Sequence, residues 1–97
     1  MKSVMVFGTR VKISRVKNLI KDYNVRGLYY YEEKRIEIDA SLKGDDYKAT
    51  LLHELVHAVW DLTGLNQTAA STDVQELVAE NISQFFTKTF KWNLRSD

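Results

Sequence analysis

Cysteine and proline are absent from the 97-residue chain, and glycine occurs only four times. Without cysteine there is no disulfide, no thiolate metal ligand and no cysteine nucleophile. No segment has the composition of a flexible linker, and no apolar run approaches the ~20 residues that cross a bilayer. We therefore expect a single domain over residues 1–97, in a reducing cytoplasm and without a membrane partner.

Net charge is also small, at +1, but its distribution is uneven. The first 26 residues carry seven Lys or Arg against Asp22 alone, whereas eleven carboxylates lie between Glu32 and Glu80. Basic segments of this kind either bind phosphate backbones or form solvated faces that balance an acidic region, and the second is commoner. The charge pattern leaves nucleic acid open as a partner without favouring it.

The first forty residues have the pattern of strands around one helix. Apolar residues at 4–7 predict a short strand, and those at 11 and 13 predict a second one after a turn. Ser14 is placed to cap a helix that ends near Asn24. Residues 27–31 and the alternating residues 35–39 then predict a hairpin, with 35–39 as a candidate edge strand.

The second half predicts two consecutive helices. Asp45 or Asp46 can cap the first helix, whose apolar periodicity continues to a stop at Gly64. Thr72 and Gln75 have the spacing of a capping box at the start of the second helix. The expected fold class is α+β, with a small antiparallel sheet packed on this helix pair and one N-terminal helix.

The only two histidines lie four residues apart on the first of these helices, and Glu54 follows directly after His53. Residues at this spacing project from the same side of a helix, so His53 and His57 can bind one metal ion. Glu54 is rotated by ~100° from His53 and can reach a water bound to that ion. The alternative is a pair of surface histidines beside an exposed glutamate. The pattern favours a metal site over that alternative.

A catalytic zinc usually has three protein ligands and one open position for water. Asp61, one turn after His57, lies on the same helix and cannot close around the ion. The following helix offers Glu76 and Glu80, which are four apart and share a face. A carboxylate from this helix is a suitable third ligand, and the alternative for the pair is a solvated helix face.

Segments 53–57 (His-Glu-Leu-Val-His) and 76–80 (Glu-Leu-Val-Ala-Glu) resemble the gluzincin metallopeptidases. The chain is also similar to the small phage- and mobile-element-associated ImmA/IrrE-like and SprT-like metallopeptidases, over roughly residues 27–90. The resemblance implies that His53, His57 and Glu76 hold Zn²⁺ and that Glu54 is the general base. It further implies that Glu80 orients one histidine, and that residues 1–97 form one minimal zincin-like domain with a zincin-type helix pair.

The activity that this resemblance implies is zinc-dependent hydrolysis of a peptide bond in a peptide or protein substrate. In gluzincins an edge strand binds an extended peptide by strand addition. No third histidine exists to polarise the oxyanion, so a tyrosine would have to serve, and the candidates are Tyr47, Tyr29, Tyr30 and Tyr31.

The sequence leaves two alternatives to catalysis. One is a non-catalytic zinc-binding module that acts in nucleic-acid binding, where the tyrosine run at 29–31 could stack bases. The other is a catalytically degenerate zincin that binds a partner protein or peptide. The sequence does not specify an oligomeric state.

Overall fold

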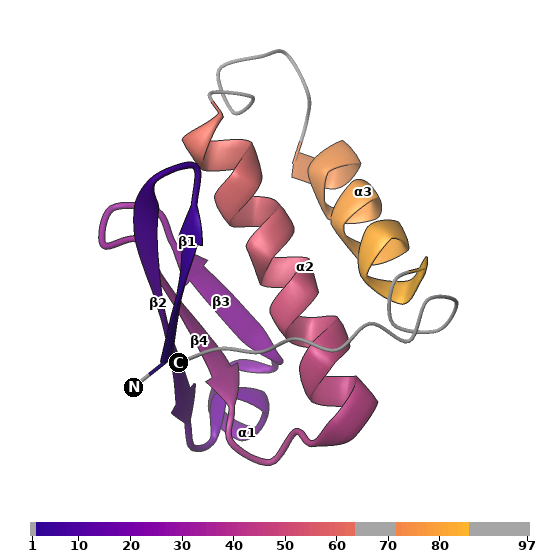
Figure 1. Ribbon diagram of the computed structural model, residues 1–97. Helices are drawn as coiled ribbons and strands as arrows, with labels where there is room; N and C mark the ends of the chain where they lie inside the picture. Colours follow the sequence, from indigo (N-terminus) through magenta and orange to yellow (C-terminus); the bar gives the residue numbers. More distant parts are fainter. Residues whose placement is uncertain (1, 64–71, 86–97) are drawn as a thin grey trace.

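The computed structural model describes residues 2–63 and 72–85. These residues form a sheet with one long helix across its face and a second helix beside the first (Figure 1). The elements are β1 (Lys2–Val6), β2 (Thr9–Val16), α1 (Leu19–Tyr23), β3 (Gly27–Tyr30), β4 (Arg35–Asp39), α2 (Gly44–Leu62) and α3 (Thr72–Phe85). The predicted α+β class is confirmed. Within the described ranges, no helix combines the length and apolar character that crossing a membrane requires.

The strand order is β1-β2-β4-β3, and the sheet is mixed. The pairs β1–β2 and β3–β4 are antiparallel, but β2 and β4 run parallel. The expectation of a purely antiparallel sheet was therefore wrong. The chain crosses from β2 through α1 to β3, and a tight hairpin then brings β4 back between β3 and β2. This path also corrects the placement of residues 35–39, because β4 is an inner strand and β3 is an edge strand of the described sheet.

Alternate residues of the inner strands face α2 and form the core. Ile36 and Ile38 of β4 and Leu51 of α2 are fully buried. Burial of side chains of this size stabilises the fold by about 1.5–3 kcal/mol each. The apolar alternation predicted for residues 35–39 is thereby confirmed as a strand pattern. The remaining buried members of this cluster are Val6, Val11, Ile13, Leu42 and Ala58.

The N-terminal helix is shorter than predicted and begins later. Ser14 lies inside β2, where it pairs with Glu37, so it caps no helix. Pairing with β4 and burial of the alternate residues of β2 outweigh the capping preference of a serine. α1 instead follows Asn18, which has a left-handed backbone conformation (φ 69°). Asp39, at the end of β4, accepts hydrogen bonds from the backbone N–H groups of Ile20 and Ser41, both at 3.0 Å, and thereby holds α1 to the sheet.

The helix α2 begins without the predicted aspartate cap. Lys43 is the N-cap residue of α2 and makes no side-chain capping bond, while Asp45 and Asp46 lie in the first turn. Carboxylates there are stabilised by the positive end of the helix dipole.

Beside α2, α3 buries its small residues Ala79 and Ser83, which allows close approach of the two helices. Gly64, the predicted stop, and the Thr72 side chain of the predicted capping box lie outside the described residues.

Candidate metal centre

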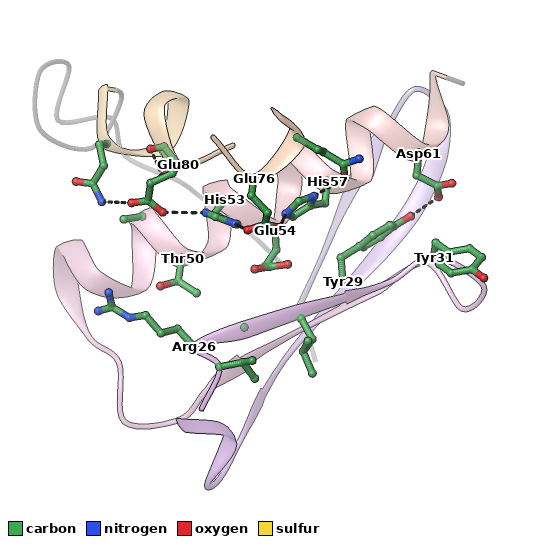
Figure 2. Close-up of a pocket in the computed structure, with 17 residues that line it drawn as sticks. Arg26, Tyr29, Tyr31, Thr50, His53, Glu54, His57, Asp61, Glu76 and Glu80 are labelled. Atoms are coloured by element: carbon green, nitrogen blue, oxygen red, sulfur yellow. Dashed lines mark hydrogen bonds and ion pairs between the residues drawn. The ribbon is translucent and has the colours of Figure 1, made fainter. Parts of the chain in front are cut away.

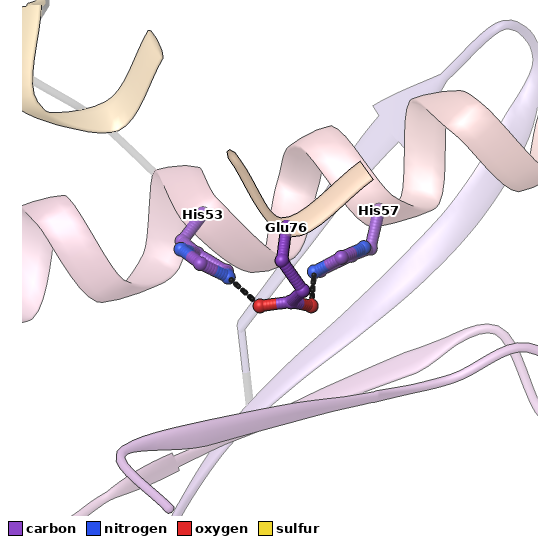
Figure 3. A group of neighbouring side chains, drawn as sticks. All are labelled: His53, His57 and Glu76. Atoms are coloured by element: carbon purple, nitrogen blue, oxygen red, sulfur yellow. Dashed lines mark hydrogen bonds and ion pairs between the residues drawn. The ribbon is translucent and has the colours of Figure 1, made fainter. Parts of the chain in front are cut away.

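Three side chains from α2 and α3 meet between the two helices. His53 and His57 lie one turn apart on α2, and their ring centroids are 5.1 Å apart. The carboxylate of Glu76 on α3 lies 3.2 Å from Nε2 of His53 and 2.7 Å from Nε2 of His57 (Figure 3). One ligand atom from each residue lies within 4.8 Å of the others. The structure thus brings the three predicted ligands together.

The donor set fits a zinc ion. Two imidazole nitrogens and one carboxylate are a ligand set of catalytic zinc, and two donors of a tetrahedral site lie about 3.3 Å apart. The separation of 3.2 Å between His53 Nε2 and the Glu76 carboxylate agrees with that value, and the separation of 2.7 Å between His57 Nε2 and this carboxylate is shorter. The histidine side chains are only 17% and 14% exposed, whereas the Glu76 side chain is 53% exposed. The two histidines are therefore largely shielded from solvent, and the site is open on the Glu76 side.

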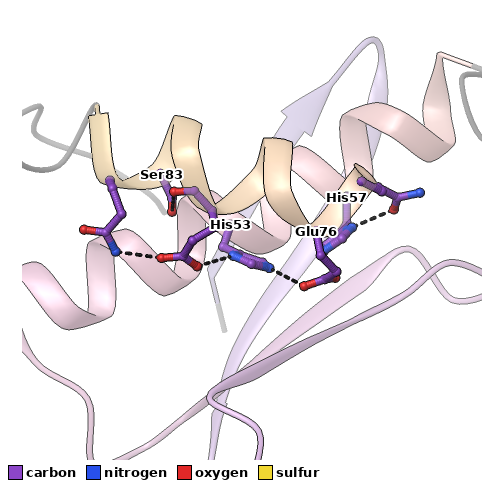
Figure 4. A network of polar contacts seen from close by, with 7 residues as sticks. His53, His57, Glu76 and Ser83 are labelled. Atoms are coloured by element: carbon purple, nitrogen blue, oxygen red, sulfur yellow. Dashed lines mark hydrogen bonds and ion pairs between the residues drawn. The ribbon is translucent and has the colours of Figure 1, made fainter. Parts of the chain in front are cut away.

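The other ring nitrogen of each histidine has a hydrogen-bond partner on α3 (Figure 4). Nδ1 of His53 lies 3.1 Å from the carboxylate of Glu80, which also accepts a hydrogen bond from the Gln84 amide at 2.8 Å. Nδ1 of His57 lies 2.7 Å from the amide oxygen of Gln75. Both partners can accept a proton from Nδ1, which is the usual arrangement of metal-binding histidines. Because the Glu76 carboxylate is an acceptor too, its contacts with the two Nε2 atoms need either a proton or a cation between the groups.

The sequence reasoning missed two residues of this network, Gln84 and Gln75, of which Gln75 contacts a histidine. It was expected to cap α3 together with Thr72, but its side-chain oxygen contacts His57 instead. Its position directly before Glu76 was the available signal, because neighbouring residues on a helix lie ~100° apart and can both face an adjacent helix. Recognising it requires the pairing of α2 with α3, which helix periodicity alone does not specify.

Glu54 points from α2 toward β3 and is only 8% exposed (Figure 2). Burial raises the pKa of its carboxyl above the ordinary value; nearby Glu76 adds to this rise, and the two histidines oppose it. A carboxylate with a raised pKa is a stronger base, and it stands beside the histidine pair. This location and environment suit a proton acceptor.

A cavity of about 590 Å³ lies between α2, α3 and β3, and the three predicted ligands and Glu54 line it. Arg26 also lines the cavity, and its guanidinium group lies 3.5 Å from the carboxylate of Asp46. Asp61 lines it as well, accepts a hydrogen bond from the Tyr29 hydroxyl at 2.7 Å, and pairs with Lys34 at 2.9 Å. The three predicted ligands therefore lie within a cleft of the size that binding sites have.

The four tyrosines that are candidates for stabilising the oxyanion differ in whether they line the cavity. Tyr29 and Tyr31 line the cavity. Tyr30 points to the other face of the sheet, where its hydroxyl donates to Glu37, and Tyr47 packs against the hydrophobic core. Burial and the neighbouring Asp61 raise the pKa of Tyr29 well above its usual range, so its hydroxyl keeps its proton.

Comparison of the chain with models of protein families, with curated proteins and with solved structures gave no match. The gluzincin resemblance therefore stays a prediction from the two sequence segments, and the case for a function depends on the geometry of the site.

Proposed function

We propose that this chain is a zinc-dependent peptidase in which His53, His57 and Glu76 hold the metal and Glu54 is the general base. One observation carries the proposal. Both Nε2 atoms face the same carboxylate, while both Nδ1 atoms are occupied by acceptors on α3. Metal-binding histidines usually have their second ring nitrogen held by an acceptor in this way.

Bound zinc would supply Lewis-acid polarisation of the scissile carbonyl and a lowered pKa of water. The Glu54 carboxylate takes a proton from the attacking water, whose oxygen forms the new bond to the carbonyl carbon. The carbon–nitrogen bond then breaks, and Glu54 returns the proton to the leaving amine. The place of Glu54 beside the histidine pair (Figure 2) suits both steps, because the group must first accept a proton from the water and then donate it to the amine.

The substrate we propose is an extended peptide segment of a peptide or protein. The cavity reaches from Arg26 along β3 to Asp61, and β3 is an edge strand of the described sheet. An edge strand can pair with an added strand, which is the binding mode that the gluzincin resemblance implies. A peptide bound in this way would cross the cavity beside Glu54.

Glu54→Gln tests the proposed base. Glutamine keeps the shape of the side chain but cannot accept a proton, so zinc binding should persist while cleavage of a peptide library, followed by mass spectrometry, falls by ~10²–10⁴-fold. Glu32→Gln is the matched control, because Glu32 is exposed in the turn between β3 and β4 and should retain full activity. Equal cleavage by Glu54→Gln and the wild type would contradict the proposal.

A second candidate function is nucleic-acid binding by the sheet face that points away from α2. Arg10 and Lys12 are exposed on β2, and Lys12 is paired in register with Arg35 of β4. Arg35 is already paired with Glu33 and Glu37, so the positive charge that this face offers a phosphate backbone is that of Arg10 and Lys12. Fluorescence anisotropy with a single-stranded oligonucleotide tests this function. Salt-dependent binding that Arg10→Ala and Lys12→Ala remove would support it, and no binding at low salt would exclude it.

A further inference from the structure

We infer that Gly27 is a positioning residue for Glu54, and this inference rests on the proposed peptidase function. Gly27 begins β3 and faces α2 at the level of Glu54. The missing side chain lets the edge strand lie close enough to α2 to fix where the Glu54 carboxylate points. Gly27 would act on catalysis only through this contact, since it has no reactive group.

The glycines among the described residues fall into two groups, those needed for their backbone conformation and one needed for its small size. Gly8 and Gly44 have positive φ values of 80° and 56°, and a Cβ atom at either position would meet nothing within 4 Å. Glycine is needed there for the backbone conformation. Gly27 is outside the left-handed region, but a Cβ atom would lie 3.0 Å from Cγ2 of Thr50 and 3.2 Å from Cγ of Glu54. Glycine is needed at position 27 for space.

A side chain at position 27 would displace Glu54 more readily than its other two neighbours. The third neighbour of an added Cβ atom is the backbone oxygen of Glu37, at 3.1 Å, which belongs to the hydrogen-bonded strand β4. Thr50 is buried on α2, and its β-branched side chain has little rotamer freedom. Glu54 is unbranched and can rotate away, so a side chain at position 27 would displace its carboxylate.

A second contact keeps β3 from moving away as a whole. Two residues after Gly27, the Tyr29 hydroxyl donates to Asp61 of α2 at 2.7 Å. The contact between Tyr29 and Asp61 (Figure 2) thus holds β3 to α2 near the far end of the cavity. At the other end, Gly27 sets the spacing beside the proposed base. Relief of the crowding by a rigid shift of the whole strand would strain this hydrogen bond.

Gly27→Ala and Gly8→Ala form a matched pair for the test. Gly27→Ala should lower kcat by about 10- to 100-fold, because small misplacements of a catalytic group have effects of this size. KM and the zinc Kd should stay within about twofold of the wild type, since no metal ligand is touched. Gly8→Ala should lower thermal stability through its positive φ while leaving kcat unchanged.

Thr50→Ser supplies a rescue, because serine lacks the Cγ2 atom that lies nearest to the added Cβ. In the Gly27→Ala background it opens space on the Thr50 side, so the added methyl group can move away from Glu54 and most of kcat should return. A Gly27→Ala variant with wild-type kcat, or a kcat loss that Thr50→Ser leaves unchanged, would overturn the inference.

Crystal structures of both glycine variants separate this inference from the peptidase proposal. We expect a displaced Glu54 carboxylate in Gly27→Ala and an unchanged one in Gly8→Ala. If the wild type cleaves no peptide but the displacement is seen, the peptidase proposal fails and the positioning role of Gly27 stands. If Glu54 is not displaced, the positioning role fails whatever the activity.

Discussion

Gln75→Leu should weaken zinc binding although Gln75 is not a proposed ligand. The Gln75 amide oxygen lies 2.7 Å from Nδ1 of His57, and leucine has a similar size but no acceptor. Without the acceptor, the proton can move to the ring nitrogen that would bind the metal, and the ring is freer to rotate. Loss of such an orienting partner typically lowers metal affinity by about 10- to 100-fold. On the free-energy scale this is about 1.4–2.8 kcal/mol.

The assay is a competition titration against a fluorescent zinc chelator at neutral pH. Gln75→Glu keeps an acceptor at the same place and should bind zinc at least as tightly as the wild type. Gln84→Leu is the matched control, because Gln84 contacts Glu80 and no histidine, so its effect should be small. Glu76→Ala, which removes a proposed ligand, should weaken binding more than either Gln75→Leu or Glu80→Ala. Wild-type affinity in Gln75→Leu would refute the reasoning.

Two predictions concern stability. Hydrogen bonds from Ser41 and Ile20 lower the pKa of Asp39 from 3.8 to about 2. The ionised Asp39 side chain therefore adds to the free energy of unfolding above pH 3.8, and this contribution is lost as the pH falls through 2. Asp39→Asn should therefore lower the free energy of unfolding by urea at neutral pH, and its deficit should shrink between about pH 4 and pH 2; a deficit independent of pH would contradict this. Tyr29→Phe removes the hydrogen bond from the Tyr29 hydroxyl to Asp61, while Asp61 still pairs with Lys34. The free energy of unfolding in the same assay should fall by about 1–2 kcal/mol. An unchanged urea midpoint would argue against that hydrogen bond.

The candidate site could be predicted largely from the sequence, because its pattern is local. Helix periodicity places His53 and His57 on one side of α2, and the same rule places Glu76 and Glu80 on one face of α3. Neither inference requires knowledge of how distant segments meet. The structure adds the pairing of the two helices, which brings Glu76 between the histidines.

The parts that the sequence did not predict depend on contacts between distant segments. Whether β4 lies at an edge or inside the sheet depends on the path of the chain through α1 and β3, which has no local signature. Ser14 has a capping preference, but partner strands on both sides of β2 outweigh it. The role of Gln75 appears only when α3 lies against α2. Gly27 likewise has no distinguishing local pattern, because its neighbours Thr50 and Glu54 are far along the chain.

Zinc content, measured on protein purified without added metal, tests the central claim most directly. Elemental analysis of the wild type should give about one zinc per chain, and His57→Ala should lose nearly all of it, because two remaining ligands hold zinc poorly. Circular dichroism of His57→Ala serves as the control that the variant has folded. A folded His57→Ala protein with one zinc per chain, or a wild type that binds no zinc when it is added, would contradict the account.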